Sequence, residues 1–292
     1  MNVDAHVHYW QIARGDYGWL TPDLPLYRDF GPEDAAPLFD ACGIDGIILV
    51  QAAPTEAETR FLLGHAERDP RVLGVVGWVD MMAQDAPDRI AALAAHPKLV
   101  GLRPMWQDIQ ADDWLLDPAQ TPAYRAIIEH GLAFDALAQV RHLPHLLRLI
   151  DRHPDLRVVI DHAAKPDIAG GGLDPWRELM RPLAAIPQIY CKFSGLLTEA
   201  GPDATIETLR AYVDTIFEFF GSERLIWGSD WPVLTVRRDY RTWWHWAGLL
   251  SSALDPADRS RIFGGNAEAF YRPGIAECAT LFRPKGSCST IP

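Results

Sequence analysis

The chain has 292 residues, of which 48% are hydrophobic and 23% are charged. This composition excludes an intrinsically disordered or fibrous protein, and the length suits one large domain or two ordinary ones around a buried core. The 39 acidic and 27 basic side chains give a net charge of -12, which repels nucleic acid and anionic lipid and suits a small neutral substrate.

Targeting signals are absent from the sequence. Residues 1–30 contain no basic start followed by an apolar run, and no stretch approaches the ~20 apolar residues of a membrane-spanning helix. The cysteines form no Cys-x-x-Cys pair, which is typical of reduced thiols in a cytosolic protein. They are Cys42, Cys191, Cys278 and Cys288. We therefore expect a cytoplasmic protein that binds neither membranes nor nucleic acid.

Eight short apolar runs recur along the chain. They lack the polar–apolar alternation of half-exposed strands, and their leucine-rich, β-branched character predicts strands that are buried on both faces of a parallel sheet. The runs span residues 1–5, 46–50, 73–79, 99–102, 132–137, 156–160, 189–193 and 225–227.

Helix signals lie between these runs. Pro32 begins a helix that ends before Gly43, and Thr55 with Glu58 forms a capping-box pattern at the start of the next one. The other predicted boundaries are a helix from Pro144 that stops before Pro154, N-cap and first-turn pairs at Asp174-Pro175 and Asp255-Pro256, and a short final helix from Asn266.

Alternating strands and helices predict a single (β/α)8 TIM barrel over residues 1–273, followed by a short C-terminal tail at 274–292. An open, doubly wound sheet is the structural alternative. That fold would need a glycine-rich phosphate turn after the first strand, where this chain has His6 and His8 instead.

Catalytic groups of such barrels lie at the carboxyl ends of the strands. Polar and ionisable side chains follow the predicted strands, and we expect them to converge on one mouth. They are His6, His8, Gln51, Trp78, Asp80, Arg103, Asp135, His162, Lys165, Lys192, Ser194 and Asp230.

The first and last strands carry the strongest of these signals. His6 and His8 stand two apart on one strand, so both imidazoles point to the same side and can hold a divalent metal or hydrogen-bond one substrate oxygen. Asp230 ends the last strand, and Pro232 disfavours helix at the residue before it, so Asp230 lies in a turn. The alternative is that the histidines and the carboxylate are ordinary strand-end and turn residues.

His162, Lys165 and Arg103 are weaker candidates, because each could be structural or solvated. Other catalytic motifs are missing: the glycines at 170–172 lack a phosphate-loop pattern, and Ser194-Gly195 lacks the nucleophile elbow of serine hydrolases. Covalent catalysis is therefore disfavoured.

The chain resembles the amidohydrolase superfamily, in its amidohydrolase-2 branch of lactonases, and most of all the sugar-lactone hydrolases such as the L-fucono-1,5-lactonases. This resemblance spans residues 1 to about 272. It is carried by Val3-Asp4-Ala5-His6-Val7-His8, the strand end at His162, Trp227-Gly228-Ser229-Asp230-Trp231-Pro232 and Gly265-Asn266-Ala267.

The resemblance implies hydrolysis of L-fucono-1,5-lactone or a related L-aldonolactone to the aldonic acid, an activity of L-fucose catabolism. Asp230 would activate the attacking water, and His6, His8 and His162 would polarise the lactone carbonyl. The predicted substrate-binding residues are Arg103, Gln51, Lys165, Trp78, Trp106 and Trp231. The alternatives are a metal-dependent decarboxylase of the same superfamily and a non-catalytic sugar-binding barrel.

The chain departs from the superfamily's metal-ligand pattern. Arg103 stands where binuclear members have a carboxylated lysine, and Asp135 stands where mononuclear members often have a histidine. His6 and His8, with Asp230 as a third candidate, form a thin ligand set for a catalytic zinc. We expect a weakly bound, dispensable zinc and no organic cofactor.

Tryptophan is unusually frequent, with eleven residues. Aromatic faces stack on the apolar side of a sugar ring, so we expect several tryptophans at the barrel mouth. Trp10, Trp19, Trp78, Trp106 and Trp231 follow predicted strands, whereas Trp243, Trp244 and Trp246 lie on the predicted helix after the last strand and should pack against the barrel.

Overall fold

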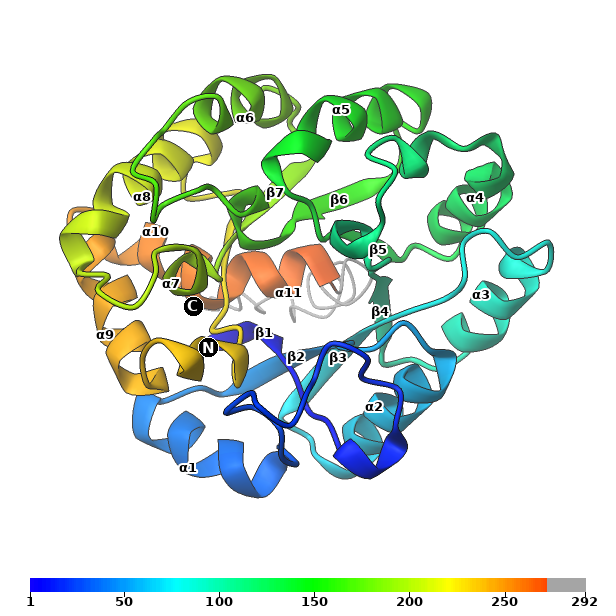
Figure 1. Ribbon diagram of the computed structural model, residues 1–292, viewed down its shortest axis with the longest axis horizontal. Coiled ribbons are helices and arrows are strands. Elements are labelled where there is room, and N and C mark those ends of the chain that lie inside the picture. Colours follow the sequence, from blue (N-terminus) through cyan, green and yellow to red (C-terminus); the bar gives the residue numbers. More distant parts are fainter. Residues whose placement is uncertain (272–292) are drawn as a thin grey trace, which may run out of the picture.

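A barrel of eight parallel strands forms the centre of the computed structural model, which describes residues 1–271 (Figure 1). The strands pair in chain order, each parallel to the next. They are β1 (Val3–Val7), β2 (Gly46–Val50), β3 (Val72–Gly77), β4 (Leu99–Leu102), β5 (Ala133–Ala136), β6 (Arg157–Ile160), β7 (Ile189–Phe193) and β8 (Leu225–Trp227).

Helices connect the strands and surround the barrel (Figure 1). This arrangement confirms the predicted TIM barrel. The helices are α1 (Pro32–Cys42), α2 (Glu56–Arg68), α3 (Ala86–Ala94), α4 (Thr121–Glu129), α5 (Leu143–Arg152), α6 (Trp176–Ala184), α7 (Leu196–Glu199), α8 (Ile206–Phe220), α9 (Tyr240–Leu250), α10 (Pro256–Ser260) and α11 (Asn266–Tyr271).

The barrel closes through the turn that follows β8. Val7 and Trp231 form a parallel bridge, and the His8 amide donates to the Trp231 carbonyl at 2.7 Å. A Cβ at Gly228 would lie 2.8 Å from the Cβ of His6, so only glycine allows the two backbones this close. The closing turn therefore brings the end of β8 directly against the histidines of β1.

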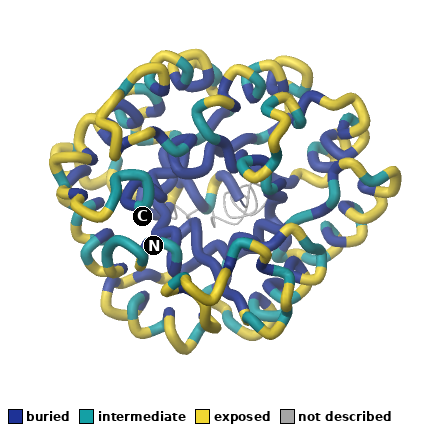
Figure 2. The backbone as a smooth tube through the Cα atoms, viewed as in Figure 1, coloured by how far each residue is buried: buried dark blue, intermediate teal, exposed yellow. Residues whose placement is uncertain are grey.

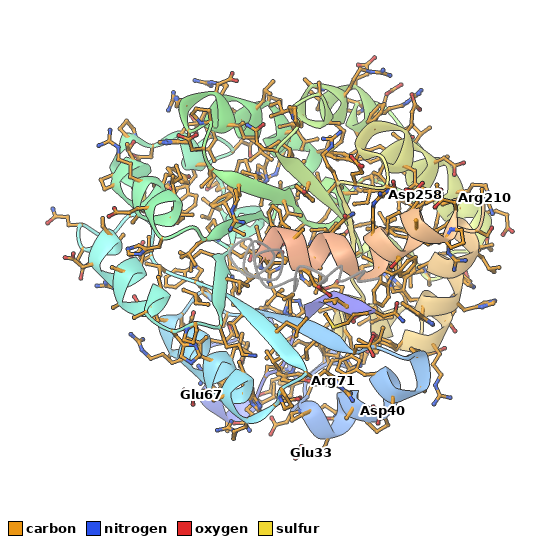
Figure 3. The ribbon with its side chains drawn as sticks, turned by 180° about the vertical axis from the view of Figure 1, so that it is seen from behind. Glu33, Asp40, Glu67, Arg71, Arg210 and Asp258 are labelled. Carbon is orange, nitrogen blue, oxygen red and sulfur yellow. The ribbon has the colours of Figure 1, made fainter. Side chains whose placement is uncertain are left out.

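Two apolar layers hold the barrel together, one between strands and helices and one inside the barrel. The inner layer combines strand residues such as Val50 and Val76 with Phe270 and Tyr271 of α11. Figure 2 shows the buried centre and the exposed outer loops, and Figure 3 shows α11 across the end of the barrel opposite to the view of Figure 1.

Charged side chains lie mainly on the outer surface (Figure 3). One example is the ion pair between Arg71 and Asp40, whose Nη2 and Oδ1 atoms are 2.7 Å apart. Among the helices of residues 1–271, none combines the length and apolarity needed to cross a bilayer. The predicted domain boundary at 273, the tail at 274–292, Cys278 and Cys288 lie outside the described residues.

Four of the predicted strands have the observed bounds, and the others differ by one or two residues at an end. The largest shift is in β1, predicted at residues 1–5 and observed at Val3–Val7. Asp4 and His6 are fully buried there. These buried polar residues interrupt the apolar run, so apolarity alone placed this strand too early.

Helix boundaries mostly follow the predictions. α1 begins at Pro32 and ends at a left-handed Gly43 cap, Asp255 caps α10 by accepting from the Asp258 amide, and α11 begins at Asn266. The exception is α6, which starts at Trp176, so that Pro175 is the N-cap instead of the first helical residue.

Candidate active site

Three imidazoles surround one carboxylate oxygen at the barrel mouth. The Oδ1 atom of Asp230 lies 3.2 Å from Nε2 of His8, 3.7 Å from Nε2 of His6 and 3.8 Å from Nε2 of His162. All four residues are buried. The residues predicted as catalytic from three separate parts of the sequence therefore meet at a single point.

The turn after β8 places Asp230. Its backbone is left-handed, with φ of 62°, and its amide donates to the His6 carbonyl at 2.9 Å. The Ser229 amide donates to Oδ1 of Asp4 at 2.8 Å, and the Tyr240 hydroxyl donates to Oδ2 of Asp4 at 2.9 Å. Asp4 thus fastens the turn to β1 and orients the Asp230 carboxylate.

A left-handed run of backbone places His162. Residues 162–165 all have positive φ values, a backbone conformation that is uncommon for residues other than glycine. Ser194 Oγ and His162 Nδ1 share a hydrogen bond of 2.9 Å. A Cβ at Gly195 would lie 2.5 Å from the His162 ring, so this glycine makes room for the imidazole.

His8 has a defined hydrogen-bonding state. Its Nδ1 lies 2.7 Å from the Val50 carbonyl, which can only accept, so Nδ1 carries the proton. Nε2 faces Oδ1 of Asp230 at 3.2 Å. Such a contact is favourable only when a proton or a cation lies between the two atoms. Metal-ligating histidines show the same pattern, with the second nitrogen donating to a carbonyl.

A buried network of charges lies beneath the histidines. Nζ of Lys192 is 2.6 Å from Oδ2 of Asp135, 3.0 Å from Oδ1 of Asp161 and 3.1 Å from Nδ1 of His6. The Tyr271 hydroxyl donates to the same Asp135 oxygen at 2.7 Å. Lys192 and both aspartates are fully buried.

Arg103 is the second cation of the site. Its Nη1 lies 3.2 Å from Nε2 of His6 and 3.4 Å from Oδ2 of Asp161, and its Nη2 donates to the Gln51 carbonyl. The sequence indicated Lys192 only as a strand-end residue, whereas Arg103 was a predicted substrate-binding residue and Asp135 stands at a metal-ligand position of related proteins. Asp161 gave no separate signal, because it directly follows the apolar run of β6.

Burial controls the charge of these groups. It lowers the pKa of His6 well below its usual value, aided by Lys192, and it lowers the pKa of His162 to about 4. Burial alone would raise the pKa of Asp230, yet His162, the hydrogen bond with His8 and Lys165 hold that pKa below its usual value. At neutral pH the site therefore contains a carboxylate beside two neutral imidazoles.

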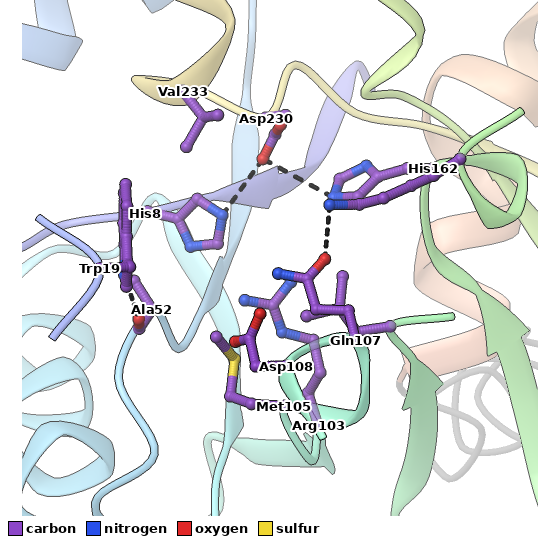
Figure 4. A pocket seen from close by; sticks show the side chains of 12 residues that line it. His8, Trp19, Ala52, Arg103, Met105, Gln107, Asp108, His162, Asp230 and Val233 are labelled. Atoms are coloured by element: carbon purple, nitrogen blue, oxygen red, sulfur yellow. Dashed lines mark hydrogen bonds and ion pairs between the residues drawn. The ribbon is translucent and has the colours of Figure 1, made fainter. Parts of the chain in front are cut away.

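A cavity of about 190 Å³ opens above this cluster (Figure 4). Lys165 spans part of the wall, and its Nζ donates to Oε1 of Gln107 at 2.5 Å. The lining combines charged, amide, aromatic and aliphatic groups. It consists of His8, Trp19, Ala52, Arg103, Met105, Gln107, Asp108, Leu137, His162, Lys165, Asp230 and Val233.

Several predicted substrate-binding residues do not line this cavity. Gln51 is fully buried and donates to the Arg103 carbonyl at 2.6 Å. Trp106 is also fully buried, stacked on His142 with ring centroids 4.1 Å apart. Trp231 packs edge-on against Tyr9 and Phe30.

Two other tryptophans that were expected at the barrel mouth line pockets. Trp78 lines an adjoining pocket of about 210 Å³, which shares Met105 and Asp108 with the main cavity. Trp19 is the tryptophan that lines the main cavity, and its indole N–H donates to the Ala52 carbonyl at 2.8 Å. Trp19 was among the tryptophans expected at the barrel mouth, whereas Gln107, which also lines the cavity, gave no sequence signal.

The described residues contain two groups with the composition of a metal site. One is His6, His8 and Asp230, and the other is His6, Asp161 and His162; within each group the ligand atoms lie within 4.8 Å of one another. The donor types suit zinc. The first group is the predicted ligand set.

Comparisons with known proteins place the chain in a family. The family model described as "Amidohydrolase" matches residues 3–272. An L-fucono-1,5-lactonase from Burkholderia ambifaria is 49% identical over 92% of this chain and 95% of its own length, and one from Burkholderia multivorans is 34% identical over 93% and 96%.

Solved structures support the same family assignment. A crystal structure of a Burkholderia multivorans amidohydrolase with bound zinc superposes with a TM-score of 0.88 at 33% identity, and covers 93% of this chain and 99% of that one. A dihydroxybenzoic acid decarboxylase from Polaromonas, at 15% identity and a TM-score of 0.66, shares the fold. The chain belongs to the amidohydrolase family.

Proposed function

We propose that this protein is a lactonase that hydrolyses L-fucono-1,5-lactone, or a related L-aldonolactone, to the aldonic acid. The observation that carries the proposal is the Asp230 carboxylate, buried among three imidazoles at the floor of a small polar cavity. The two relatives named L-fucono-1,5-lactonases support the choice of substrate. This reaction belongs to the catabolism of L-fucose.

Asp230 acts as the general base. Its low pKa keeps the carboxylate ionised at neutral pH, so it can take a proton from a water molecule that attacks the lactone carbonyl. A lactone is an activated ester, so a weak base suffices. The protonated Asp230 then returns its proton to the ring oxygen as the C–O bond breaks.

Donors around Asp230 stabilise the oxyanion. The imidazoles of His6 and His162 and the Arg103 guanidinium lie at the same floor, and hydrogen bonds to a developing negative charge in a buried site strengthen in the transition state. Lys165 and Arg103 line the cavity and bind ring hydroxyls or the carboxylate of the product. Trp19 offers an aromatic surface to the sugar ring.

The donor set fits a zinc ion, which His8 and Asp230 would hold, with His6 as the third ligand where the lone pair of its Nε2 is free. When bound, zinc would act as a Lewis acid on the lactone carbonyl. Arg103 and Lys192 already place positive charge within 3.2 Å of the His6 nitrogens. That charge opposes a divalent cation, so we propose a weak and dispensable metal.

Asp230→Asn tests the proposal. We expect kcat for L-fucono-1,5-lactone to fall by about 10²–10⁴-fold, the usual contribution of a general base, while calorimetric binding of the aldonate product persists. Asp112→Asn, the same change at a half-exposed surface residue, should leave kcat unaltered. Activity is measured with a pH indicator across a panel of 1,4- and 1,5-aldonolactones, with and without chelator.

Three outcomes contradict the proposal. Failure of the native protein on every lactone refutes lactonase activity. Strict dependence on a tightly bound metal, with release of carbon dioxide from a carboxylated substrate, identifies a decarboxylase instead. Aldonate binding without turnover of any lactone identifies a sugar-binding barrel.

A further inference from the structure

Lys192 is a fully buried cation inside the barrel. Three acceptor atoms lie within hydrogen-bonding distance of its Nζ: Oδ2 of Asp135 at 2.6 Å, Oδ1 of Asp161 at 3.0 Å and Nδ1 of His6 at 3.1 Å. The contacts with Asp135 and His6 are hydrogen bonds, and the contact with Asp161 is an ion pair. A buried ammonium that lost one of these acceptors would keep an unpaired N–H, which is costly away from water.

His6 has a cationic donor on each side of its ring. Nδ1 faces Lys192 at 3.1 Å, and Nε2 faces Arg103 at 3.2 Å. A neutral imidazole has one N–H and one lone pair, so it can accept from only one of the two cations. Its proton must lie on the other nitrogen.

The contacts favour acceptance from Lys192. Lys192 has no exposed surface, whereas Arg103 lines the cavity and its Nη1 has a second acceptor in Oδ2 of Asp161 at 3.4 Å. The Nη1 group of Arg103 therefore has an acceptor other than His6. The carboxylates on the two sides of the ring do not distinguish the tautomers, since Oδ1 of Asp230 lies 3.7 Å from Nε2 and Oδ1 of Asp161 lies 3.6 Å from Nδ1.

We propose that Lys192 is a positioning residue that holds His6 with its proton on Nε2. His6 then faces the cavity as a hydrogen-bond donor and not as a metal ligand, since ligation requires a lone pair on the coordinating nitrogen. The inference rests on the proposed lactonase function for its catalytic consequence: the Nε2–H group donates to the oxyanion. The tautomer itself does not depend on the substrate.

The first test is the tautomer of His6 in the native protein. Two-bond ¹H–¹⁵N correlation spectra of histidine-labelled protein distinguish the two tautomers, and comparison with His6→Asn assigns the signals. We expect a protonated Nε2 and an unprotonated Nδ1. A protonated Nδ1 in the native protein overturns the proposal whatever any variant shows.

The second test removes the cation without leaving a buried net charge. Lys192→Met combined with Asp135→Asn deletes one positive and one negative group from the network. We expect the His6 signals to become those of a tautomer mixture or of the Nδ1–H form, and kcat to fall by about 10²-fold with KM within threefold, as for loss of an oxyanion donor. Zinc affinity, measured by competition with a chromophoric chelator, should rise by about tenfold.

Tyr271→Phe is the matched control. It removes the hydroxyl that donates to Asp135 and leaves Lys192 beside His6, so the tautomer and the zinc affinity should stay unchanged. If the double variant folds, as judged by near-ultraviolet circular dichroism, and keeps the native His6 tautomer, Lys192 does not control it. If the double variant does not fold, the His6 tautomer seen in the spectrum of the native protein decides whether the proposal stands.

These readouts separate the inference from the proposed function. A native protein that hydrolyses no lactone but shows the Nε2–H tautomer refutes the lactonase and leaves the role of Lys192 intact. A protein that hydrolyses L-fucono-1,5-lactone with an Nδ1–H tautomer of His6 refutes the role of Lys192 and leaves the lactonase intact.

Discussion

Two residues of the site, His162 and Asp230, adopt left-handed backbone conformations with φ of 53° and 62°. This conformation costs roughly 1–2 kcal/mol for a residue with a Cβ. Neighbouring contacts offset the cost, among them the amide of Asp230 on the His6 carbonyl and the Ser194 hydroxyl on His162. Both conformations turn a polar side chain toward the same point, which a regular strand end would not do.

His142 shows how a buried histidine outside the catalytic cluster affects stability. Its side chain is fully buried against Trp106, and its Nδ1 accepts from the Gln139 amide at 3.0 Å. Burial, with the nearby Arg141, lowers the pKa of His142 to about 4. The ring is therefore neutral in the folded protein under mildly acidic conditions.

A pH-dependent loss of stability follows. The unfolded chain binds a proton at this histidine near pH 6.5, but the folded protein binds it only near pH 4. The contribution of His142 to the free energy of unfolding is thus complete above about pH 6.5. It is lost as the pH falls to about 4, and the loss amounts to up to about 3 kcal/mol. His142→Asn keeps an acceptor for Gln139 and removes the titration.

Urea unfolding at several pH values measures this effect. We expect the variant to be less stable than the native protein at pH 7, because the stacking on Trp106 is lost. The difference between their free energies of unfolding should narrow steadily toward pH 4. Parallel stability curves for the two proteins between pH 6.5 and 4 would show that His142 is not the titrating group.

At the scale of elements, helix α2 is anchored at its start to the loop that carries Trp19. Oγ1 of Thr55 accepts from the Glu58 amide at 3.1 Å and donates to Oδ2 of Asp16 at 2.7 Å. The predicted capping box is therefore half formed. The Glu58 carboxylate does not return to the cap and accepts from the amides of Ala52 and Ala53 instead, at 2.6–3.0 Å.

Thr55→Ala should lower the free energy of unfolding by about 1 kcal/mol, the usual value of an N-cap side chain. It also removes one of the two side-chain hydrogen bonds to Oδ2 of Asp16, the other being from Arg14. The change should raise KM for the lactone, since Trp19 follows Asp16 in the loop. Thr55→Ser keeps the hydroxyl and serves as the control. Thermal unfolding measures the effect on stability, and initial rates measure the effect on KM. Equal KM values for the two variants would show that the Thr55 hydroxyl does not influence the cavity.

At the scale of the whole molecule, two buried carboxylates inside the barrel have cationic partners within the chain itself. Asp135 and Asp161 pair with Lys192, and Arg103 pairs with Asp161. Because these carboxylates have resident partners, the fold needs no metal ion to compensate them.

We therefore expect chelation to leave the protein folded and active. Dialysis against a strong chelator should change Tm by less than about 2 °C, equivalent to less than about 1 kcal/mol, and kcat for the lactone by less than about twofold. Metal content before and after dialysis is measured by atomic emission. A large drop in Tm that added zinc reverses would show that the metal is structural.

The amino-acid sequence by itself determined the barrel and the identity of its main polar groups. Strand and helix signals are local: an apolar run, a capping residue or a proline acts on its immediate neighbours. His6, His8, His162 and Asp230 were recognisable because each lies within three residues of the end of a predicted strand, and strand ends of a barrel share one mouth.

Only the tertiary structure decided which side chains touch. Lys192 and His6 are separated by 186 positions along the chain and meet because the strands close into a barrel. Trp106 and Trp231 pack against other rings, whereas Trp19 lies in a long loop and lines the cavity. Side-chain direction in loops depends on packing between distant segments, and no local pattern encodes it.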